Sequence, residues 1–156
     1  KYGYNVLGCD ISTEYVQQIN DKTFDSDEYG VNEALLKTEN FEATTSIRRC
    51  VEHSNMLFLL VATPSLPNGK YDHSQIESVI EQLLQLPRPE EHKHLVVCCT
   101  TMPEYCDTVQ EKLQDHNYTV SYNPEFIAQG TILRDQENAS LVTSFSSVCP
   151  EPVVVN

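Results

Sequence analysis

Short apolar runs alternate with helix-like segments along almost the whole chain, and this alternation restricts the fold more than any other feature of the sequence. The runs that predict strands cover residues 6–10, 41–44, 56–61, 94–99 and 118–122, with a weaker run at 141–143. Helical spacing of apolar residues predicts helices over 12–20, 46–51, 72–86 and 104–116, with a short one from residue 31. Such strands and helices predict parallel βαβ units, so the expected fold class is α/β, a doubly wound parallel sheet.

The runs at 56–61 and 94–99 are apolar at nearly every position. Continuous apolar runs are typical of parallel strands covered on both faces, so both are predicted to be buried strands. The length of 156 residues fits one domain with its own core. That domain is expected over 1–145, followed by an irregular tail over 146–156, where no periodicity remains.

The charge balance excludes two classes of partner. The chain has 23 Asp and Glu against 10 Lys and Arg, a formal net charge of −13. Nucleic acid and anionic membranes both require a basic face, so neither is expected to bind. A small anion stays compatible, since backbone N–H groups at a helix N-terminus can hold a phosphate. No apolar stretch approaches the roughly 18 residues of a membrane span.

The six cysteines do not predict disulfides or a metal site. Cys9, Cys98 and Cys99 lie in apolar runs that predict buried strands, and the other three are scattered without a C-x-x-C pair. We expect reduced thiols, and therefore a cytoplasmic protein.

Parallel sheets bind ligands beyond the carboxyl ends of their strands, so the residues that follow each apolar run are the candidate site. Asp10 ends the first run. An acid at this place in a dinucleotide-binding sheet accepts hydrogen bonds from ribose hydroxyls and repels a 2′-phosphate. The alternative is an ordinary solvated turn acid beside Ser12, which is predicted to cap the next helix.

Three later runs end in a similar way. Thr63-Pro64 follows one run, Thr100-Thr101 follows the next, and Asn123-Pro124-Glu125-Phe126 follows the last of them. Each segment places a hydroxyl, an amide or a carboxylate at the expected sheet edge. Together with Asp10 they predict a polar crevice of the kind that binds a nucleotide.

These segments together resemble the UDP-glucose/GDP-mannose dehydrogenase family. The segment 3–11 resembles its second strand, and Val61-Ala62-Thr63-Pro64 with Asn68-Gly69-Lys70-Tyr71-Asp72 resembles its V-x-T-P…G-K-x-D segment. Thr100-Thr101-Met102-Pro103 resembles S-T-V-P, and the segment 123–131 resembles N-P-E-F-L-x-E-G-T. The order and the spacing agree over about residues 3–142. The Asn-Pro-Glu-Phe block is the most specific of these matches.

The resemblance implies a Rossmann-like domain that binds NAD, and an enzyme that oxidises a nucleotide sugar such as UDP-glucose at C6 to the uronic acid. By position, Asp10 would hold the adenosine ribose, and Val61, Thr63 and Thr100 would line the dinucleotide. Thr101 would lie near the reacting centre with an ordered water, and Glu125 would act as acid and base during thioester hydrolysis. The sugar nucleotide would be bound by Asn123, Glu125, Phe126 and Ile127. A homo-oligomer of the full-length protein is left open.

The chain also departs from the family pattern. The family's first strand and G-x-G-x-x-G turn would precede Lys1, so both are expected to be missing from the chain. The nucleophilic cysteine belongs to a later domain, so this chain alone is expected to be inactive. Tyr105 stands where Gly is usual, and Ala139-Ser140-Leu141 replaces P-D-R. The competing hypothesis is therefore a diverged, non-catalytic homologue that binds a nucleotide or a protein.

Overall fold

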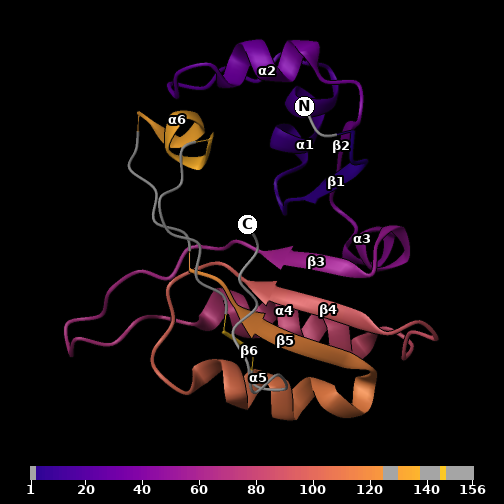
Figure 1. Cartoon of the computed structure of the whole chain (residues 1–156), viewed down its shortest axis with the longest axis vertical. Coiled ribbons are helices and arrows are strands. Elements are labelled where there is room, and N and C mark those ends of the chain that lie inside the picture. The colour runs from indigo at the N-terminus through magenta and orange to yellow at the C-terminus, as the bar shows by residue number, and fades with distance from the viewer. Residues whose placement is uncertain (1–2, 125–129, 138–144, 147–156) are drawn as a thin grey trace. The chain divides into compact units, whose positions relative to one another are not determined.

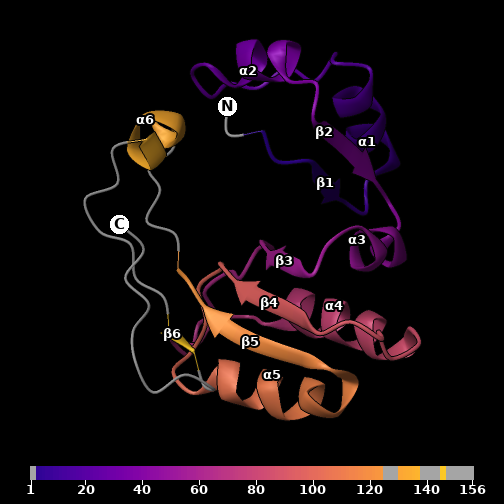
Figure 2. The same cartoon turned by 45° about the vertical axis from the view of Figure 1, so that its right-hand side comes forward.

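The computed structural model describes residues 3–124, 130–137 and 145–146. They divide into two compact units, one formed by 1–53 with 126–140 and the other by 54–125 with 141–156. Each unit carries its own parallel strands and helices, which Figures 1 and 2 show from two directions. The two units are described separately below.

The first unit contains a two-stranded parallel sheet. β1 (Val6–Cys9) pairs with β2 (Phe41–Thr44), with Val6 opposite Phe41 and Cys9 opposite Thr44. Its helices are α1 (Thr13–Asn20), α2 (Val31–Lys37), α3 (Ile47–His53) and α6 (Ile132–Glu137). α1 packs against β2 and α3 packs against β1, so β1-α1-…-β2 forms a parallel crossover unit.

The helix starts in this unit follow from local sequence. Ser12 caps α1, because its Oγ accepts a hydrogen bond from the N–H of Tyr15 at 3.2 Å. Gly30 precedes α2 with φ at 81°, a left-handed conformation that favours glycine. A Cβ at Gly30 would also lie 3.1 Å from Cδ1 of Leu133, so a larger residue is disfavoured twice at this position.

A side chain closes the outer edge of β2. The amide of Asn20, the last residue of α1, donates to the carbonyl of Ala43 at 2.9 Å and accepts from the N–H of Ala43 at 2.8 Å. These are the two backbone bonds that another strand would make there. On the other side of β1, the thiol of Cys50 lies 3.9 Å from the carbonyl oxygen of Leu7.

The second unit contains a four-stranded sheet of order β3-β4-β5-β6. β3 (Met56–Leu59), β4 (Lys93–Val97) and β5 (Tyr118–Tyr122) are parallel, and β6 (Phe145–Ser146) pairs antiparallel with β5. The connections contain α4 (Ser74–Gln85) and α5 (Tyr105–Leu113), the latter followed by a 3₁₀ turn, η1 (Gln114–His116). α4 and α5 lie on the same side of the sheet in both views (Figures 1 and 2).

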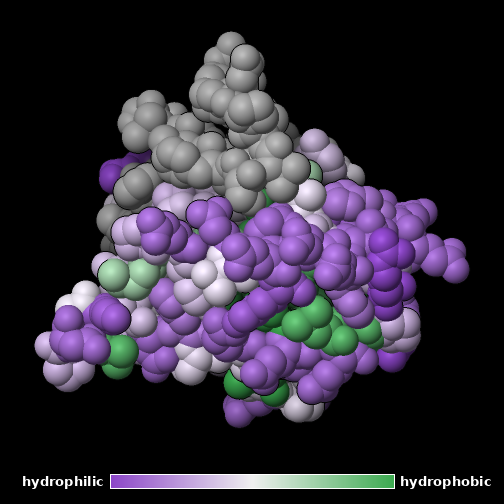
Figure 3. Space-filling view, turned by 90° about the horizontal axis from the view of Figure 1, so that it is seen from below, coloured by the Kyte–Doolittle hydropathy of each residue, from purple (hydrophilic) through white to green (hydrophobic). Residues whose placement is uncertain are grey.

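The core of the second unit lies between these helices and one face of the sheet. Its most buried residues, each at most 5 % exposed, are Leu59, Ile76, Ile80, Leu83, Leu95, Val97, Val109, Leu113, Tyr118 and Val120. The strand residues in this set alternate along β4 and β5, as expected for one face of a strand. The opposite side of α5 faces solvent, and the surface seen from that side is mostly hydrophilic (Figure 3).

The prediction of a parallel α/β, Rossmann-like fold is confirmed. β2 and β5 have the predicted bounds, and β4 is buried as predicted. The weak strand predicted at 141–143 lies outside the described residues. α6 and β6 were not predicted. No helix in the described ranges is long and apolar enough to cross a membrane.

Two predictions of burial were wrong. Met56 and Phe58 are 53 % and 58 % exposed, although the run at 56–61 predicts a strand covered on both faces. β3 is an edge strand, and these two side chains alternate with Leu59, which lies on the face that packs against the core. Cys9 is also exposed. It is the last residue of β1, and both the first and the last residue of this strand are exposed.

Candidate functional site

The carboxyl ends of β3, β4 and β5 lie in register. Leu59 pairs with Val97, and Val97 pairs with Tyr122. The next residues continue the ladder, since Cys98 N–H donates to Leu59 O at 3.0 Å and Asn123 N–H donates to Val97 O at 2.9 Å. The predicted site residues of this unit therefore emerge at one edge of the sheet.

Val61 and Thr63 follow β3 and are half-buried. The loop after them turns back on itself, because Asp72 N–H donates to Pro64 O at 2.9 Å and Ser65 bridges to Tyr71. Burial raises the pKa of the Cys99 thiol, and its hydrogen bond to the backbone of Val61 opposes this rise. That bond joins the end of β3 to the end of β4.

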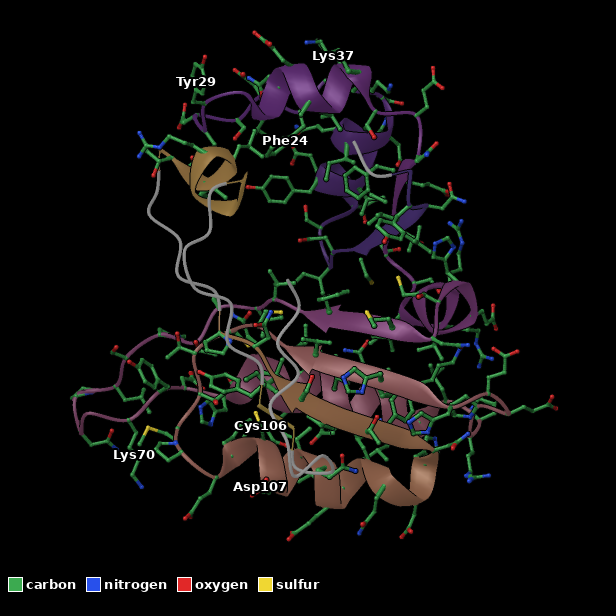
Figure 4. All side chains as sticks on the ribbon, viewed as in Figure 1. Phe24, Tyr29, Lys37, Lys70, Cys106 and Asp107 are labelled. Carbon is green, nitrogen blue, oxygen red and sulfur yellow. The ribbon has the colours of Figure 1, made fainter. Side chains whose placement is uncertain are left out.

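Thr100 and Thr101 follow β4. Thr100 is exposed, whereas Thr101 is half-buried with its Oγ1 3.9 Å from Sγ of Cys106. Cys106 lies in the first turn of α5, beside Asp107 (Figure 4). Burial raises the pKa of Cys106, so this thiol stays protonated as a neutral neighbour of the Thr101 hydroxyl. The hydroxyl of Thr101 therefore has a partner in Cys106, whereas the side chain of Thr100 is exposed and can contact a ligand.

Asn123 follows β5 and is half-buried at the same edge. Its backbone N–H continues the ladder between β5 and β4 through the bond to Val97. The other residues predicted from this block, Glu125, Phe126 and Ile127, lie outside the described residues.

Asp10 belongs to the first unit and lies between β1 and α1. Its N–H donates to Thr44 O at 3.1 Å, and its Oδ1 accepts from Ser12 N–H at 2.8 Å. Asp10 therefore does serve the turn, as the alternative interpretation proposed. Its carboxylate is nevertheless exposed, and Oδ2 has no hydrogen-bond partner among the described residues. One oxygen thus builds the turn while the other can accept from a ligand.

Sequence reasoning missed a cluster beside Thr101. The N–H of Met102 donates to Nε2 of His73 at 3.3 Å, and the ring of His73 packs on that of Tyr105 with centroids 3.8 Å apart. The Tyr105 hydroxyl donates to Oε1 of Glu77 at 2.6 Å, and Nζ of Lys112 lies 2.5 Å from Oε2. The spacing of His73 and Glu77 by four residues at a predicted helix start was the only local signal.

A metal centre finds no support. No group of three or more His, Cys, Asp or Glu side chains could hold a metal ion within the described ranges. The five cysteines in those ranges form no disulfide. The candidate residues of the second unit are hydroxyls and one amide, and that of the first unit is a carboxylate with one open oxygen.

Comparison with known proteins identifies the family. Residues 1–143 match the model of the UDP-glucose/GDP-mannose dehydrogenase family, NAD binding domain. GDP-mannose 6-dehydrogenase of Pseudomonas aeruginosa is 30 % identical over 148 residues, which cover 86 % of this chain and 34 % of that protein.

Solved structures give a similar result. A ternary complex of GDP-mannose dehydrogenase from Pseudomonas aeruginosa superposes with a TM-score of 0.84 at 26 % identity, covering 92 % of this chain and 36 % of that one. A UDP-glucose dehydrogenase from Pyrobaculum islandicum gives 0.83 at 23 %, covering 93 % and 36 %. The chain spans about a third of the length of these proteins.

Proposed function

Because the chain belongs to the UDP-glucose/GDP-mannose dehydrogenase family, whose NAD-binding domain it matches, we propose that the protein oxidises a nucleotide sugar at C6 to the uronic acid. The observation that carries the proposal is the common edge at which β3, β4 and β5 end, with Thr63 in the segment after β3 and Thr100 and Thr101 in the segment after β4. The relatives named above act on GDP-mannose or UDP-glucose, which supports a nucleotide sugar as the substrate class.

Each unit carries residues whose chemistry suits part of a dinucleotide. Asp10 has one carboxylate oxygen open, which can accept from the adenosine ribose hydroxyls, and its charge disfavours a 2′-phosphate. The side chains of Val61, Thr63 and Thr100 would line the dinucleotide with one apolar surface and two hydroxyls. When bound, NAD accepts the hydride from the alcohol carbon, while the protein supplies alignment.

The proton chemistry falls to two residues in this proposal. Thr101 would hold a water or the substrate oxygen through its half-buried hydroxyl. Glu125 would accept and return a proton, since removal of hydride from an alcohol and attack by water both require a proton acceptor. Asn123, Phe126 and Ile127 would contact the sugar nucleotide.

We place this activity in the cytoplasm and in polysaccharide biosynthesis, where uronic acids are used as nucleotide sugars. The absence of disulfides among the described cysteines supports a reducing compartment. A homo-oligomer is compatible with the proposal. The net charge of −13 supports the exclusion of nucleic acid.

Two assays test the proposal. Calorimetric titration of the full-length protein with NAD should give saturable binding, and that protein should form NADH with UDP-glucose or GDP-mannose. The 156-residue chain alone should form no NADH with NAD and UDP-glucose. Failure of the full-length protein to bind NAD would contradict the proposal.

The second candidate, a non-catalytic homologue, is favoured by Tyr105 and by Ala139-Ser140-Leu141, which replace residues usual in the family. It predicts NAD or nucleotide binding by the full-length protein without turnover of any nucleotide sugar. The turnover assay therefore separates the two candidates.

A further inference from the structure

The segment 100–104 joins β4 to α5 and carries Thr100 and Thr101. Its backbone turns sharply, since Tyr105 N–H donates to Met102 O at 3.2 Å and Glu104 has a φ of 65°. A non-glycine residue in the left-handed region is uncommon and is held there by its surroundings. Here the surrounding residues belong to α5, to α4 and to His73, which directly precedes α4.

His73 supplies one of these contacts. Its Nε2 accepts the N–H of Met102 at 3.3 Å, so this nitrogen carries no proton and the ring is the neutral Nδ1–H form. Met102 directly follows Thr101, and its N–H is the only backbone donor of 100–104 whose described acceptor is a side chain. His73 therefore fixes the peptide group between Thr101 and Met102.

Tyr105 holds His73 in place. The two rings pack at 3.8 Å with an interplanar angle of 37°, and the Tyr105 hydroxyl donates to Glu77. Burial raises the pKa of Tyr105 above its ordinary range, and the bond to Glu77 adds to the rise, so the hydroxyl remains a donor. Burial works to raise the pKa of Glu77, but the bonds from Lys112 and Tyr105 outweigh it, so this carboxylate stays charged.

We propose that His73 and Tyr105 are positioning residues that brace the Thr101–Met102 peptide and so set the geometry of the cofactor's reacting end. The inference rests on the proposed function for its catalytic part. The chain of contacts runs from Lys112 through Glu77, Tyr105 and His73 to Met102, and it links two helices to the segment that carries Thr101.

Two substitutions at His73 test the brace. His73→Phe keeps a ring against Tyr105 and removes the acceptor, whereas His73→Gln removes the ring and places an amide oxygen near the position of Nε2. Hydrogen exchange of the peptide that contains Met102 should accelerate about fivefold in His73→Phe and stay close to wild type in His73→Gln. The matched control is His53→Phe, the same change at an exposed histidine of α3.

Turnover of the full-length protein gives the functional readout. In His73→Phe, kcat should fall about tenfold with little change in KM for NAD, because misplacement of the reacting end costs rate more than binding. His73→Gln, which retains an acceptor, should restore kcat. Tyr105→Phe should keep the ring contact and reduce kcat less than His73→Phe does.

Two results would overturn the inference. If hydrogen exchange at Met102 is unchanged in His73→Phe, His73 does not brace the peptide. If exchange is faster but kcat is unchanged, the brace has no role at the reacting end of the cofactor. If the wild-type protein neither binds NAD nor turns over, the proposed function fails, and the catalytic part of the inference fails with it. The exchange comparison still decides the brace in that case.

Discussion

The hydroxyl of Thr119 lies 2.7 Å from Nδ1 of His94, within a chain of hydrogen bonds on the face of the sheet opposite α4 and α5. The same hydroxyl lies 3.0 Å from Nε2 of His92, and Nε2 of His94 lies 2.9 Å from the hydroxyl of Ser121. Two imidazoles and two hydroxyls thus form a continuous line along β4 and β5.

The direction of this chain follows from Asn117. Its amide nitrogen donates to the carbonyls of Pro89 and Glu90, so its Oδ1 faces His92 and must accept from Nδ1–H at 3.3 Å. With both rings neutral, each later bond runs in one sense: Thr119 donates to Nε2 of His92 and accepts from Nδ1 of His94, and Ser121 donates to Nε2 of His94.

Acidification should destabilise the second unit through His94. Burial lowers the pKa of His94 from 6.5, and the neighbouring His92 lowers it further. The unfolded chain binds the proton more readily, so stability is complete above about pH 6.5 and falls as the pH drops below that value. The expected loss is below about 1 kcal/mol, because the ring is partly exposed and solvent screens it.

Urea denaturation at neutral and at acidic pH measures this effect. His94→Asn should show a smaller pH dependence than the wild type. An equal pH dependence in the two proteins would rule out His94 as its source.

Removal of the Tyr118 hydroxyl should stabilise the fold. The side chain is 2 % exposed, and its hydroxyl is buried without a hydrogen-bond partner among the described residues. Tyr118→Phe removes this desolvated group, so the free energy of unfolding should rise by about 1 kcal/mol. Tyr105→Phe is the matched control, since that hydroxyl is bonded to Glu77 and its loss should lower stability. Thermal melts that shift in the same direction for both variants would contradict this account.

Asp10→Asn should separate the two uses of the carboxylate. The amide oxygen still accepts from Ser12, so the melting temperature should stay near that of the wild type. The loss of charge should weaken NAD binding about tenfold and narrow the preference over NADP, because a charged acceptor makes stronger bonds to hydroxyls and repels the 2′-phosphate. Calorimetric titration with both cofactors checks this, and Asp10→Ala should lose stability as well. Equal NAD affinity in Asp10→Asn would exclude the ribose role.

The Thr101 hydroxyl should matter for turnover and not for folding. Thr101→Val keeps the shape and removes the hydroxyl, so kcat of the full-length protein should fall about tenfold or more, since alignment by one polar group is lost. Thr101→Ser retains the hydroxyl and should stay within a few-fold of wild type. NADH formation with a nucleotide sugar measures both. A similar kcat for Thr101→Val and the wild type would exclude the role.

Local patterns predicted much of this fold because they involve neighbours in the chain. β5 could be predicted from its own alternation, and Ser12 as a helix cap from the residues around it. The ends of β3, β4 and β5 could be predicted as one edge because parallel strands share their direction. The six-residue helix α6 is too short for a periodic pattern.

Other features depend on contacts far apart in the sequence. The exposure of Phe58 depends on what lies beside and above β3, which its own apolar run cannot indicate. His73 and Met102 are 29 residues apart in the sequence, and they come into contact only when α4 and the crossover to β4 have formed. His94 and Thr119 meet only through the register of two strands. Such pairs are decided by tertiary structure, and no local pattern predicts them.

The amide of Asn20 has a consequence for self-association. Exposed strand edges let chains join edge to edge and build aggregates. Because Asn20 already satisfies both backbone groups of Ala43, β2 offers no free ladder at its centre for another molecule to continue. Replacing Asn20 with Ala would leave the N–H and the carbonyl of Ala43 without these partners. The uncharged side chain of Asn20 therefore protects this edge of β2 from pairing with a strand of another molecule.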